Sequence, residues 1–285
     1  MLKLFSISLI LIFLLSMYFT YSFDPIRVMA YVSMGLALSA VSIVVYYRRA
    51  ELLATECVHI GLFAITLGYI VEYLYGISAF LIAIFMGLII VHLANYMVHL
   101  GISVEKASAV VVSFVSAMSV IAIHYILVYI PVRYSLPAII IGDPLLITRN
   151  EAITAICISI LVLFIVILTI KELINTSIDP VSASLAGLRT RVYDFIAYTI
   201  IGLTAIGLLR LAGYVMEHIL LLLPAIVSSL YSSSLREHIV NTILVGASFS
   251  ALGFALAKQL NTTPTGLTGL LIMILIVINY MVRRL

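Results

Sequence analysis

The chain has 285 residues, of which 64% are hydrophobic and only 9% are charged, and its mean hydropathy is +1.28. So few polar side chains cannot cover the surface of a water-soluble globule of this length. The formal net charge of +3 is small, and the basic residues are scattered instead of clustered with aromatic residues, which argues against a nucleic-acid-binding surface. Composition alone therefore predicts an integral membrane protein.

Apolar runs long enough to cross a bilayer follow one another along the chain. They predict an all-α integral membrane protein with about ten transmembrane helices in a single domain, 1–285. The expected spans are 4–22, 26–47, 52–71, 77–97, 107–130, 150–170, 192–210, 212–228, 238–258 and 265–282. The first run, within residues 1–22, is interpreted as an extra N-terminal span, with a cleaved signal peptide as the alternative.

The distribution of basic residues predicts the orientation in the cell membrane, because cytoplasmic loops carry an excess of Lys and Arg. If the N-terminus is cytoplasmic, ten basic residues lie inside: Lys3, Arg48, Arg49, Lys106, Lys171, Arg189, Arg191, Arg236, Arg283 and Arg284. Five lie outside: Arg27, Arg133, Arg149, Arg210 and Lys258. Both termini are therefore expected in the cytoplasm.

The outer loop 131–149 is less polar than an ordinary loop and contains Pro131, Pro137 and Pro144. Prolines at this spacing do not allow one regular helix through the whole segment. We expect a short helix that lies on the outer face of the membrane.

The polar segment 171–191 interrupts the apolar pattern on the cytoplasmic side. It contains Asp179 followed by Pro180, and Gly187 stands seven residues beyond Pro180. An aspartate before a proline starts a helix, and a glycine just past its end stops it. The segment is predicted to be a cytoplasmic loop built around a short helix, with a surface for a cytoplasmic partner.

Acidic and imidazole side chains within the spans are candidates for function, since a charge at mid-membrane costs at least ~2.5 to 3.5 kcal/mol. Glu56 and His59 are three residues apart and share a helical face, and His59 lies about 15 Å from the cytoplasmic end. Glu217 and His218 are adjacent in a later span, so their side chains diverge by about 100°. Together they are candidates for a transient divalent-cation site, not a stable structural metal site. The alternative is that each simply buries a polar contact between helices.

Three groups of residues resemble the membrane permease subunits of ATP-binding-cassette importers for zinc, manganese and iron, from about Met29 to Ile278. The most specific group is Asp179-Pro180, Ala183 and Gly187-Leu188, followed by Gly213 and then Leu223-Pro224-Ala225. The second group is Arg48-Arg49, Leu52-Leu53 and His59. The third is Gly142-Asp143 in the outer loop.

The sequence also departs from the pattern of this family near the histidine. Thr55 stands where the family has an aspartate, Val58 replaces a serine, and Phe63-Ala64 replaces a Pro-Gly pair. Glu56 is interpreted as the carboxylate that takes the place of the aspartate. Glu217 and His218 occupy positions that are ordinarily apolar in the family.

The resemblance implies a type II importer fold in which two copies of the chain enclose a pathway with alternating access. It implies an ATPase partner that receives the helix Asp179 to Gly187, and an extracytoplasmic metal-binding protein on the opposite side. The chain itself is then a transport subunit and not an enzyme, with a divalent metal as substrate and no stably bound cofactor.

Two rival functions follow from the same residues. Buried Glu and His side chains also suit a proton-conducting subunit of a respiratory or antiporter complex, although that function does not explain the helix at Asp179 to Gly187. An intramembrane enzyme would need a clustered motif such as His-Glu-x-x-His, and the sequence contains none.

Overall fold

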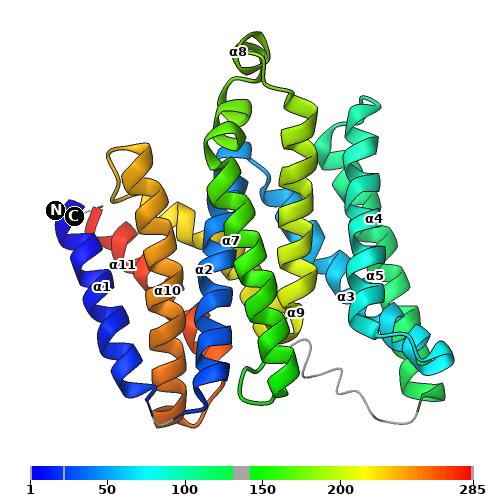
Figure 1. Ribbon diagram of the computed structural model, residues 1–285, viewed down its shortest axis with the longest axis horizontal. Coiled ribbons are helices and arrows are strands. Elements are labelled where there is room, and N and C mark those ends of the chain that lie inside the picture. The colour runs from blue at the N-terminus through cyan, green and yellow to red at the C-terminus, as the bar shows by residue number, and fades with distance from the viewer. Residues whose placement is uncertain (1, 22, 131–141, 284–285) are drawn as a thin grey trace.

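The computed structural model describes residues 2–21, 23–130 and 142–283, and all regular structure in these ranges is helical. The helices are α1 (Leu2–Phe19), α2 (Pro25–Arg48), α3 (Glu51–Tyr75), α4 (Ala79–His99), α5 (Val104–Tyr129), α7 (Arg149–Ile178), α8 (Pro180–Leu185), α9 (Thr190–Ser229), α10 (Leu235–Leu260) and α11 (Pro264–Arg283). They form a bundle from which α8 projects at one end (Figure 1). The all-α prediction is confirmed.

Membrane-length helices account for most of the bundle. Within the described residues, seven helices, α2 to α5, α7, α9 and α10, are long and apolar enough to cross a bilayer. The apolar parts of α1 and α11 are shorter, Leu4–Phe19 and Pro264–Asn279. The expected spans thus all correspond to helices. The helix expected in the outer loop falls largely on residues 131–141, which lie outside the described residues.

Two expected spans, 192–210 and 212–228, belong to the single element α9, which contains a sharp turn. Gly213 has the non-helical angles φ 75° and ψ 156° within it. Asp194 in its first half pairs with Arg48 at the end of α2, while Ala225 in its second half accepts a hydrogen bond from His238, which also contacts Tyr47. Both ends of α9 therefore lie beside the end of α2, and the chain reverses at Gly213.

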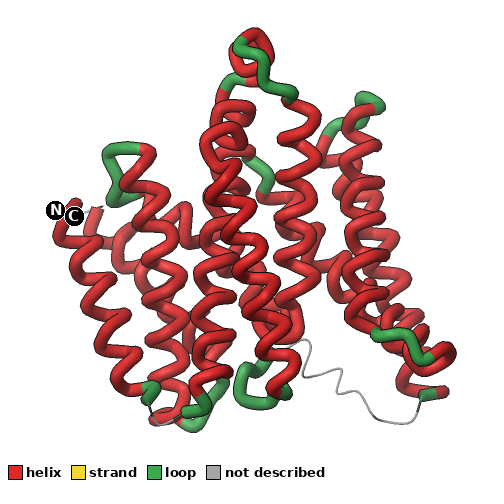
Figure 2. The backbone as a smooth tube through the Cα atoms, in the orientation of Figure 1, coloured by secondary structure: helices red, strands yellow, loops and turns green. Residues whose placement is uncertain are grey.

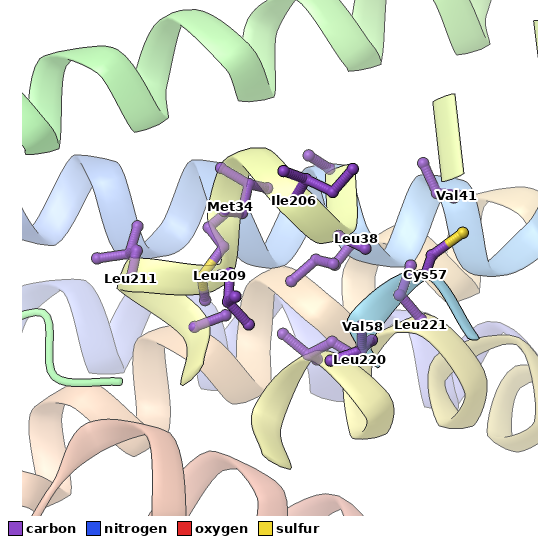
Figure 3. Packing of buried hydrophobic residues seen from close by; sticks show 14 of the residues in the cluster. Met34, Leu38, Val41, Cys57, Val58, Ile206, Leu209, Leu211, Leu220 and Leu221 are labelled. Atoms are coloured by element: carbon purple, nitrogen blue, oxygen red, sulfur yellow. The ribbon is translucent and has the colours of Figure 1, made fainter. Parts of the chain in front are cut away.

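Helix α2 lies at the centre of the bundle, between α7, α9 and α10 (Figures 1 and 2). It is buried along most of its length, whereas α4, α5 and α7 each expose much of their surface. Apolar side chains of α2, α3 and both halves of α9 meet in this core (Figure 3), among them Met34, Leu38, Val58, Leu209 and Leu221. This packing places α3 against both halves of α9.

The polar segment 171–191 is more helical than the sequence indicated. Helix α7 continues through Lys171 and Glu172 to Ile178, and α9 begins at Thr190. A charged residue marks where a helix leaves the hydrocarbon, but it does not end the helix, since Lys and Glu are good helix formers. Helix α8 is consequently held at the adjacent ends of α7 and α9 and projects beyond the rest of the bundle (Figure 2).

Candidate functional site

His59 of α3 and His218 of α9 lie close together, although 159 positions separate them in the sequence. Their ring centroids are 6.1 Å apart. Tyr214 lies between them: its hydroxyl is 2.8 Å from Nε2 of His59, and its backbone oxygen is 2.8 Å from Nδ1 of His218. All three side chains are only partly buried. We call His59, Tyr214 and His218 the imidazole cluster.

Sequence reasoning did not identify Tyr214. It stands directly after Gly213 and four residues before His218, so it shares a helical face with that histidine. The turn at Gly213 then directs this face toward α3. The helical spacing was visible in the sequence, but the packing of this face against α3 was not.

The two carboxylates lie in a different environment from the imidazoles. Glu56 is 1% exposed, and its Oε2 accepts a hydrogen bond of 2.6 Å from Ser108 of α5. Glu217 is fully buried. Oε1 of Glu56 and both carboxylate oxygens of Glu217 have no hydrogen-bond partner among the described residues.

The structure therefore brings together one histidine from each predicted Glu–His pair, and not the members of either pair. Within the described ranges, no hydrogen bond joins Glu56 to His59 or Glu217 to His218. In the same ranges, no group of three or more His, Cys, Asp or Glu side chains is placed to hold a metal ion. Two imidazoles and a phenol hydroxyl offer an incomplete ligand set, which suits brief contact with a cation better than retention.

A cavity of about 340 Å³ lies between α3, α4, α7 and α9. Its polar lining includes Glu72, Asn150, Glu151 and Arg210. Arg210 pairs with Glu151, which also accepts a hydrogen bond from the backbone of Thr148. The imidazole cluster is not part of its lining, so the cavity is a feature separate from the cluster.

Gly142 packs directly against the turn in α9. Gly142 has φ 62°, and a β-carbon at this position would overlap the backbone of Ala212 and Gly213. The carbonyl of Gly142 accepts a hydrogen bond of 2.8 Å from the hydroxyl of Thr265, at the start of α11. The loop and α11 thus hold the turn that immediately precedes Tyr214.

Helix α8 carries the start and stop signals that the sequence predicted. Asp179 accepts hydrogen bonds from the backbone N–H groups of Val181 (3.1 Å) and Ser182 (3.0 Å). At its end, the N–H of Leu188 donates to the carbonyl of Ala183 and the N–H of Gly187 to that of Ser184, both at 3.0 Å. This is a Schellman motif, with Gly187 at φ 88°.

Helix α8 exposes apolar surface at the tip of the bundle. Ala183 is buried, whereas Val181 and Leu185, one turn apart, are 69% and 85% exposed. Pro180 and Gly187 are exposed as well. An exposed apolar face on a short, well-capped helix is typical of a surface that binds another protein.

The cap at Asp179 leads to a first prediction. Hydrogen bonds from the side chain and backbone of Ser182 lower the pKa of Asp179 below its usual value. A lowered pKa means that the charged cap stabilises the helix above the usual pKa of about 3.9 and loses this effect as the pH falls through the lower value. We expect Asp179→Ala to speed amide hydrogen exchange at Val181 and Ser182 near neutral pH. Asp179→Asn, which also caps helices, should change it much less; equal effects of the two substitutions would contradict this role.

Comparison with known proteins identifies the family. The ABC 3 transport family matches residues 5–284. Manganese import system permease protein ScaB of Streptococcus parasanguinis is 25% identical over 231 residues, which cover 81% of this chain and 80% of ScaB. Manganese transport system membrane protein MntC of Listeria monocytogenes is 23% identical over 235 residues, which cover 82% of this chain and 81% of MntC.

A solved structure has the same fold. PsaBC from Streptococcus pneumoniae in complex with Fab matches this chain with a TM-score of 0.77 at 20% identity, covering 93% of this chain and 94% of that one. The family match extends over nearly the whole sequence, and the family resemblance drawn from the motifs is confirmed. The chain is a member of the ABC 3 transport family.

Proposed function

We propose that this protein is the transmembrane permease subunit of an ATP-driven importer for divalent metal ions, with manganese as the first candidate. The family match and the names of its relatives ScaB and MntC support this function. They also favour import over the rival function of a proton-conducting subunit. Imidazole ligands also accept zinc and iron. The choice of manganese therefore rests on the names of the relatives and not on the ligand set.

The observation that carries the proposal is the exposed helix α8 at the tip of α7 and α9. A transport subunit that hydrolyses no nucleotide must receive mechanical work through a rigid element that contacts the ATPase. Asp179 and Gly187 cap α8 at its two ends, and Val181 and Leu185 present an apolar surface between them. The residues that build this coupling element are Asp179, Pro180, Ala183, Gly187 and Leu188.

The substrate path runs past the imidazole cluster. His59 and His218 would contact the ion as it crosses, with Tyr214 holding the orientation of both rings. Glu56 and Glu217 lie one helical turn and one residue away, respectively, and would belong to the same path as buried polar groups behind the imidazoles. Because each copy offers so few ligands, release of the ion is not opposed by a strong site.

Two copies would line the pathway and alternate between access to either side of the membrane. In this arrangement the protein lies in the cell membrane with α8 and both termini in the cytoplasm, where the ATPase subunits bind. An extracytoplasmic metal-binding protein would deliver the ion at the opposite end, where the outer loop meets α11.

The test is transport by the purified permease reconstituted in proteoliposomes with its ATPase and metal-binding protein. We expect uptake of manganese, with zinc and iron as comparison ions. His59→Ala and His218→Ala should each lower uptake by at least about tenfold, since even residues that only orient metal ligands cost 10–100-fold on mutation.

The matched control is His124→Ala, which removes an exposed imidazole of α5 that is not part of the imidazole cluster. It should transport like the wild type. Absence of ATP-dependent uptake of any of the three ions by the wild type would contradict the proposed function. Normal uptake by His59→Ala and His218→Ala would leave the importer intact but remove the imidazole cluster from the path.

A further inference from the structure

Arg48, the last residue of α2, contacts both of the helices that support α8. Its guanidinium pairs with the carboxylate of Asp194 near the start of α9. Nη1 of the same group donates to the hydroxyl of Thr176 near the end of α7, at 3.5 Å. Thr176 in turn donates to the carbonyl of Glu172 at 2.8 Å, so its oxygen can accept from Arg48.

This contact lies at the base of the α7–α8–α9 unit. Thr176 stands three residues before Asp179, and Asp194 stands five residues after Arg189. The Arg48 side chain is only 11% exposed, and that of Asp194 is 30% exposed. Coulomb attraction is less screened here than at a surface, and the loss of either partner would leave a poorly solvated charge.

The turn that follows Arg48 joins α2 to α3, the helix that carries His59 of the imidazole cluster. Arg49 has the left-handed angle φ 52°, and the N–H of Ala50 donates to the carbonyl of Val45 at 3.0 Å. In this tight turn, only Arg49 and Ala50 separate the end of α2 from the start of α3 at Glu51. His59 follows eight residues later on the same rigid helix.

We propose that Arg48 is a positioning residue that transmits movement of α8 to the α2–α3 turn and so to His59. This inference depends on the proposed function, because α8 moves only if an ATPase subunit drives it. A displacement of α8 shifts the ends of α7 and α9 together, and the Arg48 contacts carry the end of α2 with them. Without these contacts, movement of α7 and α9 reaches α3 only through the apolar packing between the helices.

The test measures ATPase activity of the complete reconstituted complex, without and with the manganese-loaded binding protein. Arg48→Gln should keep basal hydrolysis but bring the ratio of stimulated to basal activity close to one. The double variant Arg48→Asp with Asp194→Arg should restore part of the stimulation, which a purely local loss of stability would not do. Arg49→Gln is the matched control, because it removes the same charge from the adjacent exposed residue.

Thr176→Val provides a milder variant in case Arg48→Gln does not assemble with the ATPase. It keeps the side-chain volume and the ion pair, removes only the acceptor on α7, and is expected to lower the stimulation ratio partially. If the wild type is stimulated and both Arg48→Gln and Thr176→Val are stimulated equally, the role of Arg48 is refuted and the proposed function stands. If the wild type itself shows no stimulation, the proposed function fails.

Discussion

Gly187→Glu is expected to assemble with the ATPase and lose the stimulation of hydrolysis by the metal-loaded binding protein. Gly187 closes α8 with φ 88°, and a β-carbon at this position would meet no atom within 4 Å. The substitution therefore leaves the bundle intact. It adds a negative charge to the end of α8 and imposes roughly 1–2 kcal/mol of backbone strain on its Schellman motif. The measurement compares basal and stimulated ATPase rates, together with the yield of assembled complex.

A matched control separates the docking surface from the backbone strain. Gly101, between α4 and α5, has φ 91° and equally open surroundings, and this loop lies at the same end of the bundle as α8 (Figure 1). Gly101→Glu adds the same side chain with a similar strain but away from α8. Normal coupling in Gly101→Glu with lost coupling in Gly187→Glu is the expected result. Normal coupling in both variants would contradict the role of α8.

Gly142→Ala is expected to abolish metal uptake and to lower the thermal stability of the purified protein. The added methyl group would overlap the backbone of Ala212 and Gly213, and backbone atoms cannot rotate away as a side chain can. Overpacking of this kind costs about 1–3 kcal/mol, in addition to the strain of a positive φ. The loop must therefore move away from the turn that sets the position of Tyr214. Uptake in proteoliposomes and Tm in detergent measure the two effects.

Gly76→Ala is the control for the positive φ alone. Gly76 has φ 72° in the turn after α3, but a β-carbon there would meet nothing within 4 Å. It should lose a little stability and retain uptake. If Gly142→Ala behaves like Gly76→Ala, the contact between the outer loop and the turn in α9 is not needed to hold the imidazole cluster.

The sequence predicted the elements whose signals are local. Hydropathy depends on a run of neighbouring residues, so the spans were found with errors only at their ends, as at α7. The cap at Asp179 and the stop at Gly187 depend on hydrogen bonds over a few residues, and both were placed correctly. The boundary between spans 192–210 and 212–228 also fell within a few residues of the turn at Gly213.

The contacts between distant segments required the tertiary structure. His59 and His218 were both candidates from the sequence, but their proximity depends on the reversal at Gly213 and on the packing of α9 against α3. Arg48 looked like one more basic residue at a span end, and its contacts with Asp194 and Thr176 follow from the central position of α2. The amino-acid sequence by itself determined which segments are helical and apolar and where α8 begins and ends, since these properties come from neighbours along the chain. The tertiary structure alone decided which polar side chains meet, because the low polarity of the bundle strengthens such contacts but does not specify their partners.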